Sequence, residues 1–266
     1  MPADEALRPA ADQSGGGSEN GIHHVDSSTL VVCIDGPSGS GKSTVARGVA
    51  RTLRLRYLDT GAMYRALTWA VLERGVDPVD VDAVVAAAAD LDLEISTDPV
   101  SGSAAVGDVA VAGRDVTAAI RTGPVTHAVS TVSAIPEVRR RMVALQRSII
   151  GAGGIVVEGR DIGTAVCPDS PVKIFLTASP EARAARRSAE ESDPAARRDV
   201  AAVEADLARR DRLDSTRVAS PLNQAPDAVV LDSTTLDVQG AVAFVVDLVA
   251  RTLGTLTFDH VGGQRP

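Results

Sequence analysis

The fold of this chain is decided by Gly36-Pro37-Ser38-Gly39-Ser40-Gly41-Lys42-Ser43-Thr44, which fits the pattern G-x-x-x-x-G-K-[ST]. A β-rich apolar run at 30–34 precedes this stretch and a helical pattern at 42–53 follows it. Its glycines let successive backbone N–H groups point into one concavity, and the start of the helix adds partial positive charge. A chance Gly/Ser linker is the alternative reading, but a linker would not need a strand before it and a helix after it. The sequence therefore predicts a phosphate-binding loop (P-loop).

The same motif assigns chemistry to two of its side chains. Lys42 carries a compact ammonium group that can bridge the β- and γ-phosphates of ATP, and Ser43 carries a hydroxyl that can bind Mg²⁺. Lysine is rare elsewhere, since Lys173 is the only other lysine among 27 basic residues. Lys173 precedes an apolar run, so we expect it to be a surface charge at the end of a strand. The residues expected to bind ATP are Gly36, Pro37, Ser38, Gly39, Ser40, Gly41, Lys42, Ser43 and Thr44.

Strand and helix patterns alternate along the rest of the chain. Short apolar runs predict strands at 30–34, 56–58, 155–158, 172–176 and 228–231. Helical patterns lie at 42–53, 62–74, 137–150, 180–190, 195–210 and 237–253. Strands that alternate with helices form parallel sheets with right-handed crossovers. We therefore expect an α/β, three-layer P-loop fold with a parallel sheet of about five strands.

Residues 91–112 break this alternation. They contain Leu-Asp-Leu-Glu-Ile, then a Ser-Gly-Ser turn, then short Val/Ala runs, which predicts a small antiparallel β insert beside the main sheet. Residues 1–28 are acidic and polar and show no periodicity, so we expect a disordered extension there. The folded domain is then expected at 29–254, followed by a flexible tail at 255–266.

Composition excludes several classes of protein. The chain has 266 residues, a net charge of −8 and a pI near 5.0, which argues against a protein that follows a nucleic-acid backbone. Its N-terminus lacks the basic and apolar regions of a signal peptide, and its longest apolar stretches are far short of a membrane span. We therefore expect a monomeric cytoplasmic protein whose partners are small anionic molecules.

Sequence motifs also separate the classes of P-loop protein. A guanine-binding switch uses an Asn-Lys-x-Asp motif, but neither Asn20 nor Asn223 precedes a lysine. An ATPase motor usually has an apolar strand that ends in Asp-Glu, whereas here the strand 155–158 ends in Glu158 and continues Gly-Arg-Asp. A kinase for a small molecule remains.

Three further segments place arginines or hydroxyls beside predicted strand or helix ends. They are 57–65, 158–161 and 210–217. Segment 158–161 follows a sheet strand, at the carboxyl edge where ligands bind to open α/β sheets. Each segment alone could be an ordinary solvated salt-bridge surface. Together with the P-loop they indicate a second site, for an acceptor that carries a phosphate.

With these segments in view, the chain resembles the bacterial cytidylate kinases of the nucleoside monophosphate kinase group. The resemblance covers about 31–253 and rests on 36–44, 58–65, 115–122, 130–136 with Arg139, 159–161, 168–176 and 210–217. It implies transfer of the γ-phosphoryl group of Mg·ATP to CMP or dCMP, which gives ADP and CDP or dCDP. Position 60 is threonine where serine is frequent in the family, which keeps the hydroxyl.

The resemblance also implies a division of labour among the site residues. Those expected to read the cytosine are Thr60, Arg139, Asp161 and Arg217. Those expected near the pentose are Ser130, Arg210 and Asp214, and those near the acceptor phosphate are Arg65 and Arg160. A monophosphate-binding part at about 60–150 and a short helical lid at about 183–198 are implied as well. The lid candidates are Arg183, Arg186, Arg187, Arg197 and Arg198, and the residues expected to be catalytic are Lys42, Arg160, Arg186 and Arg187.

Two other functions stay open from the sequence. The first is a kinase for another small acceptor, such as a different nucleotide or a cyclic alcohol. An alcohol would need a carboxylate near its hydroxyl, and Asp59 and Asp161 are the candidates. The second is a nucleotide-binding module without turnover, in which arginines at an acceptor site would have no use.

Overall fold

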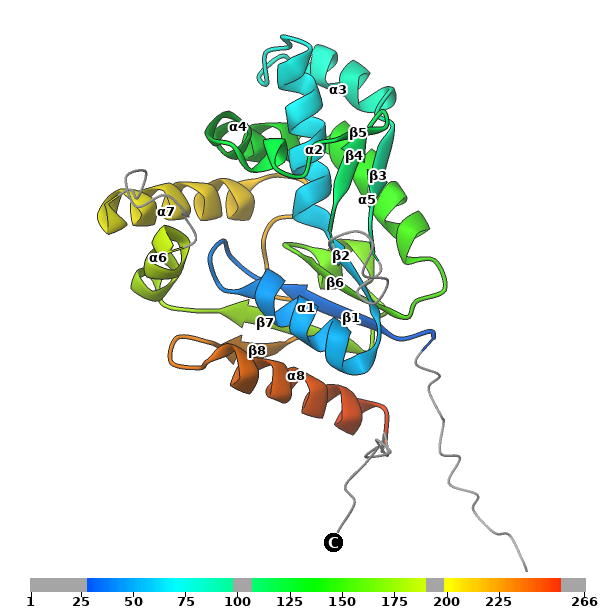
Figure 1. Cartoon of the computed structure of the whole chain (residues 1–266), viewed down its shortest axis with the longest axis vertical. Coiled ribbons are helices and arrows are strands. Elements are labelled where there is room, and N and C mark those ends of the chain that lie inside the picture. Colours follow the sequence, from blue (N-terminus) through cyan, green and yellow to red (C-terminus); the bar gives the residue numbers. More distant parts are fainter. Residues whose placement is uncertain (1–27, 98–106, 190–198, 255–266) are drawn as a thin grey trace, which may run out of the picture.

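The computed structural model of the chain describes residues 28–97, 107–189 and 199–254. Figure 1 shows a central sheet with helices on both faces and a second group of helices and short strands above it. The extension predicted at 1–28 lies outside the described residues except for Ser28, and so does the tail predicted at 255–266. None of the described helices is both long enough and apolar enough to span a bilayer.

The central sheet has five parallel strands in the described residues, in the order β2-β6-β1-β7-β8. They are β1 (Val31–Asp35), β2 (Arg56–Asp59), β6 (Ile155–Gly159), β7 (Val172–Thr177) and β8 (Val229–Asp232). Val32 of β1 lies opposite Val156 of β6 and Val172 of β7, so the apolar run before the P-loop is the middle strand of the sheet. The predicted α/β sheet is confirmed, and the P-loop starts at its centre.

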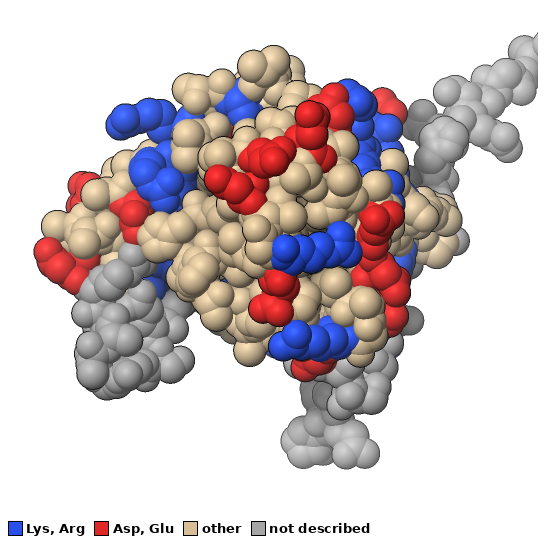
Figure 2. Space-filling model, turned by 90° about the horizontal axis from the view of Figure 1, so that it is seen from above, with Lys and Arg blue, Asp and Glu red and all other residues tan. Residues whose placement is uncertain are grey.

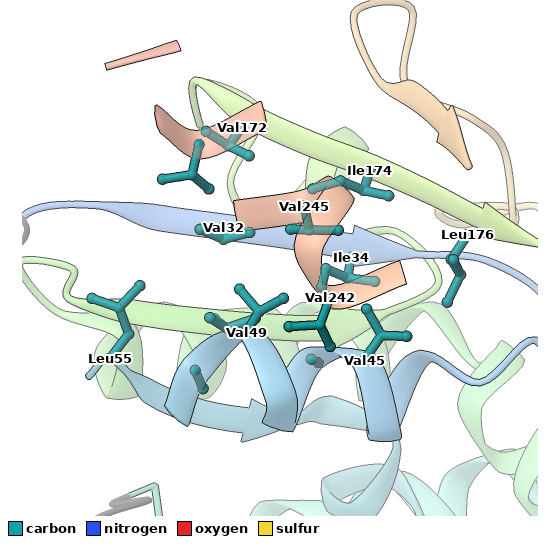
Figure 3. Packing of buried hydrophobic residues seen from close by; sticks show 14 of the residues in the cluster. Val32, Ile34, Val45, Val49, Leu55, Val172, Ile174, Leu176, Val242 and Val245 are labelled. Carbon is teal, nitrogen blue, oxygen red and sulfur yellow. The ribbon is translucent and has the colours of Figure 1, made fainter. Parts of the chain in front are cut away.

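One face of the sheet is covered by α1 (Lys42–Leu53) and α8 (Val238–Thr252). Figure 3 shows Val45 and Val49 of α1 packed with Val245 of α8 against the valines and isoleucines of β1 and β7. Because α1 leaves the P-loop directly, this packing fixes the direction in which the start of the helix points.

A second buried cluster joins the other face of the sheet to α2 (Thr60–Glu73), α4 (Gly123–Ala134) and α5 (Pro136–Ile150). Leu58 of β2, Leu67 of α2, Val132 of α4 and Met142 of α5 belong to one buried cluster. The cluster holds α2 and α4 above the carboxyl ends of the strands, and both helices carry predicted site residues.

The predicted β insert is a three-stranded antiparallel sheet in the order β3-β4-β5. Its strands are β3 (Leu93–Ile95), β4 (Val109–Val111) and β5 (Arg114–Asp115), so the last strand lies just beyond the predicted limit of 112. Val109 and Val111 pack on Ala66 and Ala70 of α2. A short 3₁₀ helix, η1 (Ala119–Arg121), leads from this sheet to α4.

Among the described residues, two α-helices were not predicted from the sequence. They are α3 (Val81–Ala89) and α4. The alanine-rich stretch of α3 reads only as an apolar run, and α4 begins at Gly123-Pro124, a pair that usually marks a turn. Proline is tolerated at the start of a helix because the N–H groups there have no partner within the helix.

The last two helices near the P-loop are α6 (Pro180–Ala189) and α7 (Val200–Thr216), which pack on each other. We call them the α6–α7 pair. Their shared buried cluster contains only Ala184, Val203 and Leu207 among the described residues. The helix predicted at 195–210 begins at Val200 in the described residues and continues to Thr216. In this longer helix, buried Asp214 lies on the same face as Val203 and Leu207. Residues 190–198 of the predicted lid, which include Arg197 and Arg198, lie outside the described residues.

The prediction for Lys173 was wrong. Its side chain is buried within β7, 6% exposed, and its ammonium group pairs with Asp227 at 2.7 Å. The strand is covered here by the loop before β8, which a single sequence does not reveal. On the face of the molecule shown in Figure 2, by contrast, exposed acidic and basic side chains lie in small interspersed groups.

Candidate active site

A cavity of about 530 Å³ lies at the carboxyl ends of β1, β2 and β6, between the P-loop, α2, α4 and α7. Predicted site residues from these four elements, from the end of β6 and from α6 line it. They are Ser38, Gly39, Gly41, Lys42, Ser43, Thr44, Thr60, Arg65, Ser130, Arg160, Arg187, Arg210, Asp214 and Arg217. Carboxyl ends of parallel strands are where open α/β sheets bind ligands, as expected for segment 158–161.

The P-loop has the backbone that its glycines predict. Gly41 lies at φ 89°, a left-handed conformation that glycine adopts without strain, and it is the residue before α1. A Cβ on Gly36 would lie 2.0 Å from the carbonyl oxygen of Leu176 on β7. The loop therefore approaches the sheet more closely than any side chain allows.

Lys42 is buried and lies across the loop. Its Nζ donates to the carbonyl oxygen of Pro37 at 2.6 Å and to Ser40 Oγ at 3.5 Å. Burial and the neighbouring Arg160 lower the pKa of Lys42 to about 7. A phosphate group beside the ammonium would raise this pKa again, so the lysine is placed for an anionic ligand.

Ser43 faces the acidic side of the cavity. Its hydroxyl donates to Glu158 Oε2 at 3.0 Å, and the Tyr57 hydroxyl donates to the other oxygen of the same carboxylate. Burial and nearby Asp59 raise the pKa of Glu158. A serine hydroxyl with two carboxylates close by is an oxygen-rich environment of the kind that Mg²⁺ prefers.

Asp59 and Thr60 connect β2 to α2. The Asp59 carboxylate caps α2 by accepting the N–H of Ala62 at 2.8 Å, and it pairs with Arg65 at 2.8 Å. Burial alone would raise the pKa of Asp59, but the attraction of Arg65 and the N–H group lowers it. The Thr60 hydroxyl donates to the carbonyl oxygen of Glu158 at 2.7 Å, which ties the start of α2 to β6.

Arg139, Asp161 and Arg217 form a buried group at the cavity wall, and of the three only Arg217 lines the cavity. The Arg139 guanidinium pairs with Asp161, and Arg217 lies 3.6 Å from the other carboxylate oxygen. Their side chains are only 3 to 6% exposed. Arg139 also lies over the ring of Tyr64, 5.2 Å from its centroid. Burial and Arg139 lower the pKa of Arg217, so further hydrogen-bond acceptors at this end would be stabilising.

Arg160 joins the P-loop to α7. Its Nε donates to Asp214 at 3.1 Å and its Nη2 donates to Ser38 Oγ at 2.6 Å. Arg210 lies on the same side of α7 and lines the cavity, and burial together with Arg160 lowers its pKa to about 10. Positive charge is thus concentrated between the P-loop and the Arg139 group, where an anion would offset it.

The two arginines of α6 that were expected to be catalytic have different surroundings. Arg187 lines the cavity. Arg186 donates to the carbonyl oxygen of Ser233 at 2.6 Å and approaches that of Ser40 at 3.5 Å, on the outer side of the P-loop.

Some cavity residues were not predicted from the sequence. Arg47 of α1 and Arg121 of η1 line the cavity on the side of Arg65. Arg47 lies four residues after Ser43 on α1, a spacing that puts both on one face of the helix and could have indicated it. Arg121 belongs to segment 115–122, which carries part of the family resemblance but received no role.

Comparison with known proteins identifies the family of the chain. The family model described as cytidylate kinase matches residues 32–251. A cytidylate kinase of Corynebacterium glutamicum is 54% identical over 223 residues, which are 83% of this chain and 94% of that protein. Cytidylate kinases of Streptomyces griseus and Mycolicibacterium paratuberculosis are 52% and 51% identical over 224 residues, which are 84% of this chain and 93% and 96% of those proteins. The chain therefore belongs to the cytidylate kinase family.

Proposed function

We propose that this protein transfers the γ-phosphoryl group of ATP to CMP or dCMP and releases ADP with CDP or dCDP. The observation that carries the proposal is one cavity with a P-loop on one wall, a buried Arg–Asp–Arg group at another, and arginines between them. The family membership supports the same reaction.

The chemistry of the acceptor explains why arginines dominate the site. A phosphomonoester has a second pKa near 6, so at pH 7 it is mostly a dianion and needs no general base to become a nucleophile. Its difficulty is repulsion from the ATP phosphates. Catalysis is then charge neutralisation and in-line positioning, for which the planar guanidinium fork suits phosphate oxygens well.

For the individual residues we keep the roles expected from the family pattern. Those proposed to read the cytosine are Thr60, Arg139, Asp161 and Arg217; those proposed for the pentose are Ser130, Arg210 and Asp214; those proposed for the acceptor phosphate are Arg65 and Arg160. The burial of Arg139 and Asp161 supports a role in base selection, because desolvated donors and acceptors discriminate strongly between ligands that do and do not satisfy them.

The transferred phosphoryl group is proposed to meet Lys42, Arg160 and Arg187, with Arg186 beside the P-loop. The position of Arg187 in the cavity wall supports its part. Closure of α6, which carries Arg186 and Arg187, would exclude water, so that ATP is not simply hydrolysed.

Mg²⁺ is proposed to enter with ATP. The described residues hold no group of three or more His, Cys, Asp or Glu that could bind a metal alone. Ser43, whose hydroxyl donates a hydrogen bond to Glu158, fits a cation whose other ligands are phosphate oxygens and water. Bound there, Mg²⁺ would supply charge neutralisation between the β- and γ-phosphates.

An alcohol acceptor is disfavoured by the partners of the two candidate bases. Asp59 is engaged by Arg65 and an N–H group, and Asp161 is engaged by Arg139 and Arg217. A carboxylate held by cations is a poor proton acceptor. The monomeric state and the cytoplasmic location expected from the sequence stay predictions.

A panel of acceptors tests the proposed function. ADP formation would be measured with ATP and, in turn, CMP, dCMP, UMP, AMP and shikimate. We expect the highest kcat/KM for CMP or dCMP. A preference for any other acceptor, or ADP formation that no acceptor stimulates, would show that the proposal is wrong.

A further inference from the structure

Ser38 of the P-loop is held by the α6–α7 pair on both sides of its peptide backbone. Its N–H donates to Asp211 Oδ1 at 3.2 Å, and its carbonyl oxygen accepts from Arg183 Nη1 at 3.0 Å. Arg183 of α6 and Asp211 of α7 also form an ion pair with each other. The two helices therefore reach the P-loop through one closed set of hydrogen bonds.

These contacts are largely shielded from water. Ser38 is 6% exposed, and the side chains of Arg183 and Asp211 are 11% and 18% exposed. Removing one partner of such a pair leaves a buried polar group without a hydrogen bond. This lowers the free energy of unfolding more than the loss of an exposed ion pair does. The backbone is close here as well, because a Cβ on Gly39 would lie 3.0 Å from the carbonyl oxygen of Arg183.

The α6–α7 pair is held together by few apolar contacts in addition to these polar ones. The described part of the α6–α7 pair shares a buried cluster of only three small or medium side chains. The position of α7 relative to the P-loop therefore depends on Arg183 and Asp211, together with the link through Arg160 described above. Asp211 is followed one turn later by Asp214, which holds Arg160, and is preceded directly by Arg210.

We propose that Arg183 and Asp211 are a positioning pair that transmits occupancy of the P-loop to the acceptor side of the cavity. ATP fixes the backbone of the P-loop, Ser38 fixes the pair, and the pair fixes the end of α7 that carries Arg210 and Asp214. Such a link must act in both directions, since coupling between two binding sites is reciprocal. This inference rests on the proposed function, because it assumes that a nucleotide binds on each side.

The test is a measurement of binding rather than turnover. The affinity for CMP would be determined by calorimetry with and without a non-hydrolysable ATP analogue, for the unaltered protein, Arg183→Ala and Asp211→Asn. Arg212→Ala is the matched control, since Arg212 lies on the same helix next to Asp211 and is exposed. We expect the analogue to tighten CMP binding about 10-fold in the unaltered protein and the control, and less than about 2-fold in both variants.

Two further measurements separate positioning from a general loss of structure. Thermal unfolding shows whether each variant is folded, and the isosteric Asp211→Asn keeps the shape of the site if Arg183→Ala does not fold. In the double variant Arg183→Ala/Asp211→Asn, we expect the ATP analogue to change the affinity for CMP by no less than in Arg183→Ala, because the two side chains act as one unit.

The inference would be overturned by variants that keep the 10-fold coupling, or by an unaltered protein that shows none. It would also be overturned if Asp211→Asn tightened binding of the ATP analogue with the coupling intact, because Asp211 would then only compete with phosphate for the Ser38 N–H. Failure of the proposed function is a separate result, namely absence of CMP turnover by the unaltered protein.

Discussion

Individual arginines are held in position here by the carboxylates that face them. Arg217 is the clearest case, since its guanidinium is 4% exposed and lies between Asp161 at 3.6 Å and Asp214 at 3.9 Å. Arg139 approaches Asp161 from the other side. A pyrimidine edge presented to this group would meet donors and acceptors whose directions are already fixed.

Replacing Arg217 by alanine tests the proposed base selection. We expect the ratio of kcat/KM for CMP to that for UMP to fall by about 10-fold or more, because a fixed buried donor that distinguishes the two bases is lost. The ratio is measured by steady-state kinetics with each acceptor at saturating ATP. Arg212→Ala should leave the ratio unchanged. An undiminished ratio in Arg217→Ala would remove Arg217 from the base site.

Asp35 provides a second test at the level of one residue. It is 5% exposed and accepts the N–H groups of Ile162 and Gly163 at 2.9 and 2.8 Å. Burial raises its pKa from 3.8 to about 6. The folded state therefore favours the protonated form, and the free energy of unfolding falls as pH rises between about 4 and 6.

The variant Asp35→Asn cannot ionise, so it should escape this loss. The quantity to compare is the free energy of unfolding of Asp35→Asn minus that of the unaltered protein. We expect this difference to be about 2 kcal/mol more favourable to the variant at pH 7.5 than at pH 4.5. Any constant cost of the lost hydrogen bond cancels in this comparison. Denaturant unfolding at the two pH values measures it, and a difference that does not change with pH would contradict the raised pKa.

At the scale of elements, the P-loop depends on the strand beside it. Gly36 has φ 149° and no room for a Cβ against the backbone of Leu176, whereas Gly75 has φ 68° and nothing within 4 Å. Both positions are strained for alanine, but only the first produces a clash. Comparing alanine at Gly75 with alanine at Gly36 therefore separates the cost of backbone strain from the cost of a steric clash.

Gly75→Ala is expected to cost about 1 kcal/mol in the free energy of unfolding, from its positive φ alone. Gly36→Ala should cost at least about 3 kcal/mol, because β7 and the loop must move apart. Both values come from urea denaturation. Equal effects of the two substitutions would mean that the close approach of the loop to β7 is not important for stability.

At the scale of the whole molecule, local patterns predicted the sheet strands, α1 and the insert, because burial of β-rich runs and helical periodicity leave direct traces in sequence. The start of α4 at Gly123-Pro124 did not, since that pair serves turns and helix starts alike. The contacts of the cavity could not be predicted either. Arg183 meets Asp211, and Lys173 meets Asp227, only after distant segments have packed.

We propose that one cavity of the molecule brings the γ-phosphate of ATP to the phosphate of a cytidine nucleotide. It is tested most directly by following the γ-phosphorus of labelled ATP in the presence of CMP. We predict that the label appears in the β-phosphate of CDP in an amount equal to the ADP formed. Label released as inorganic phosphate, or none transferred to CMP, would contradict the account.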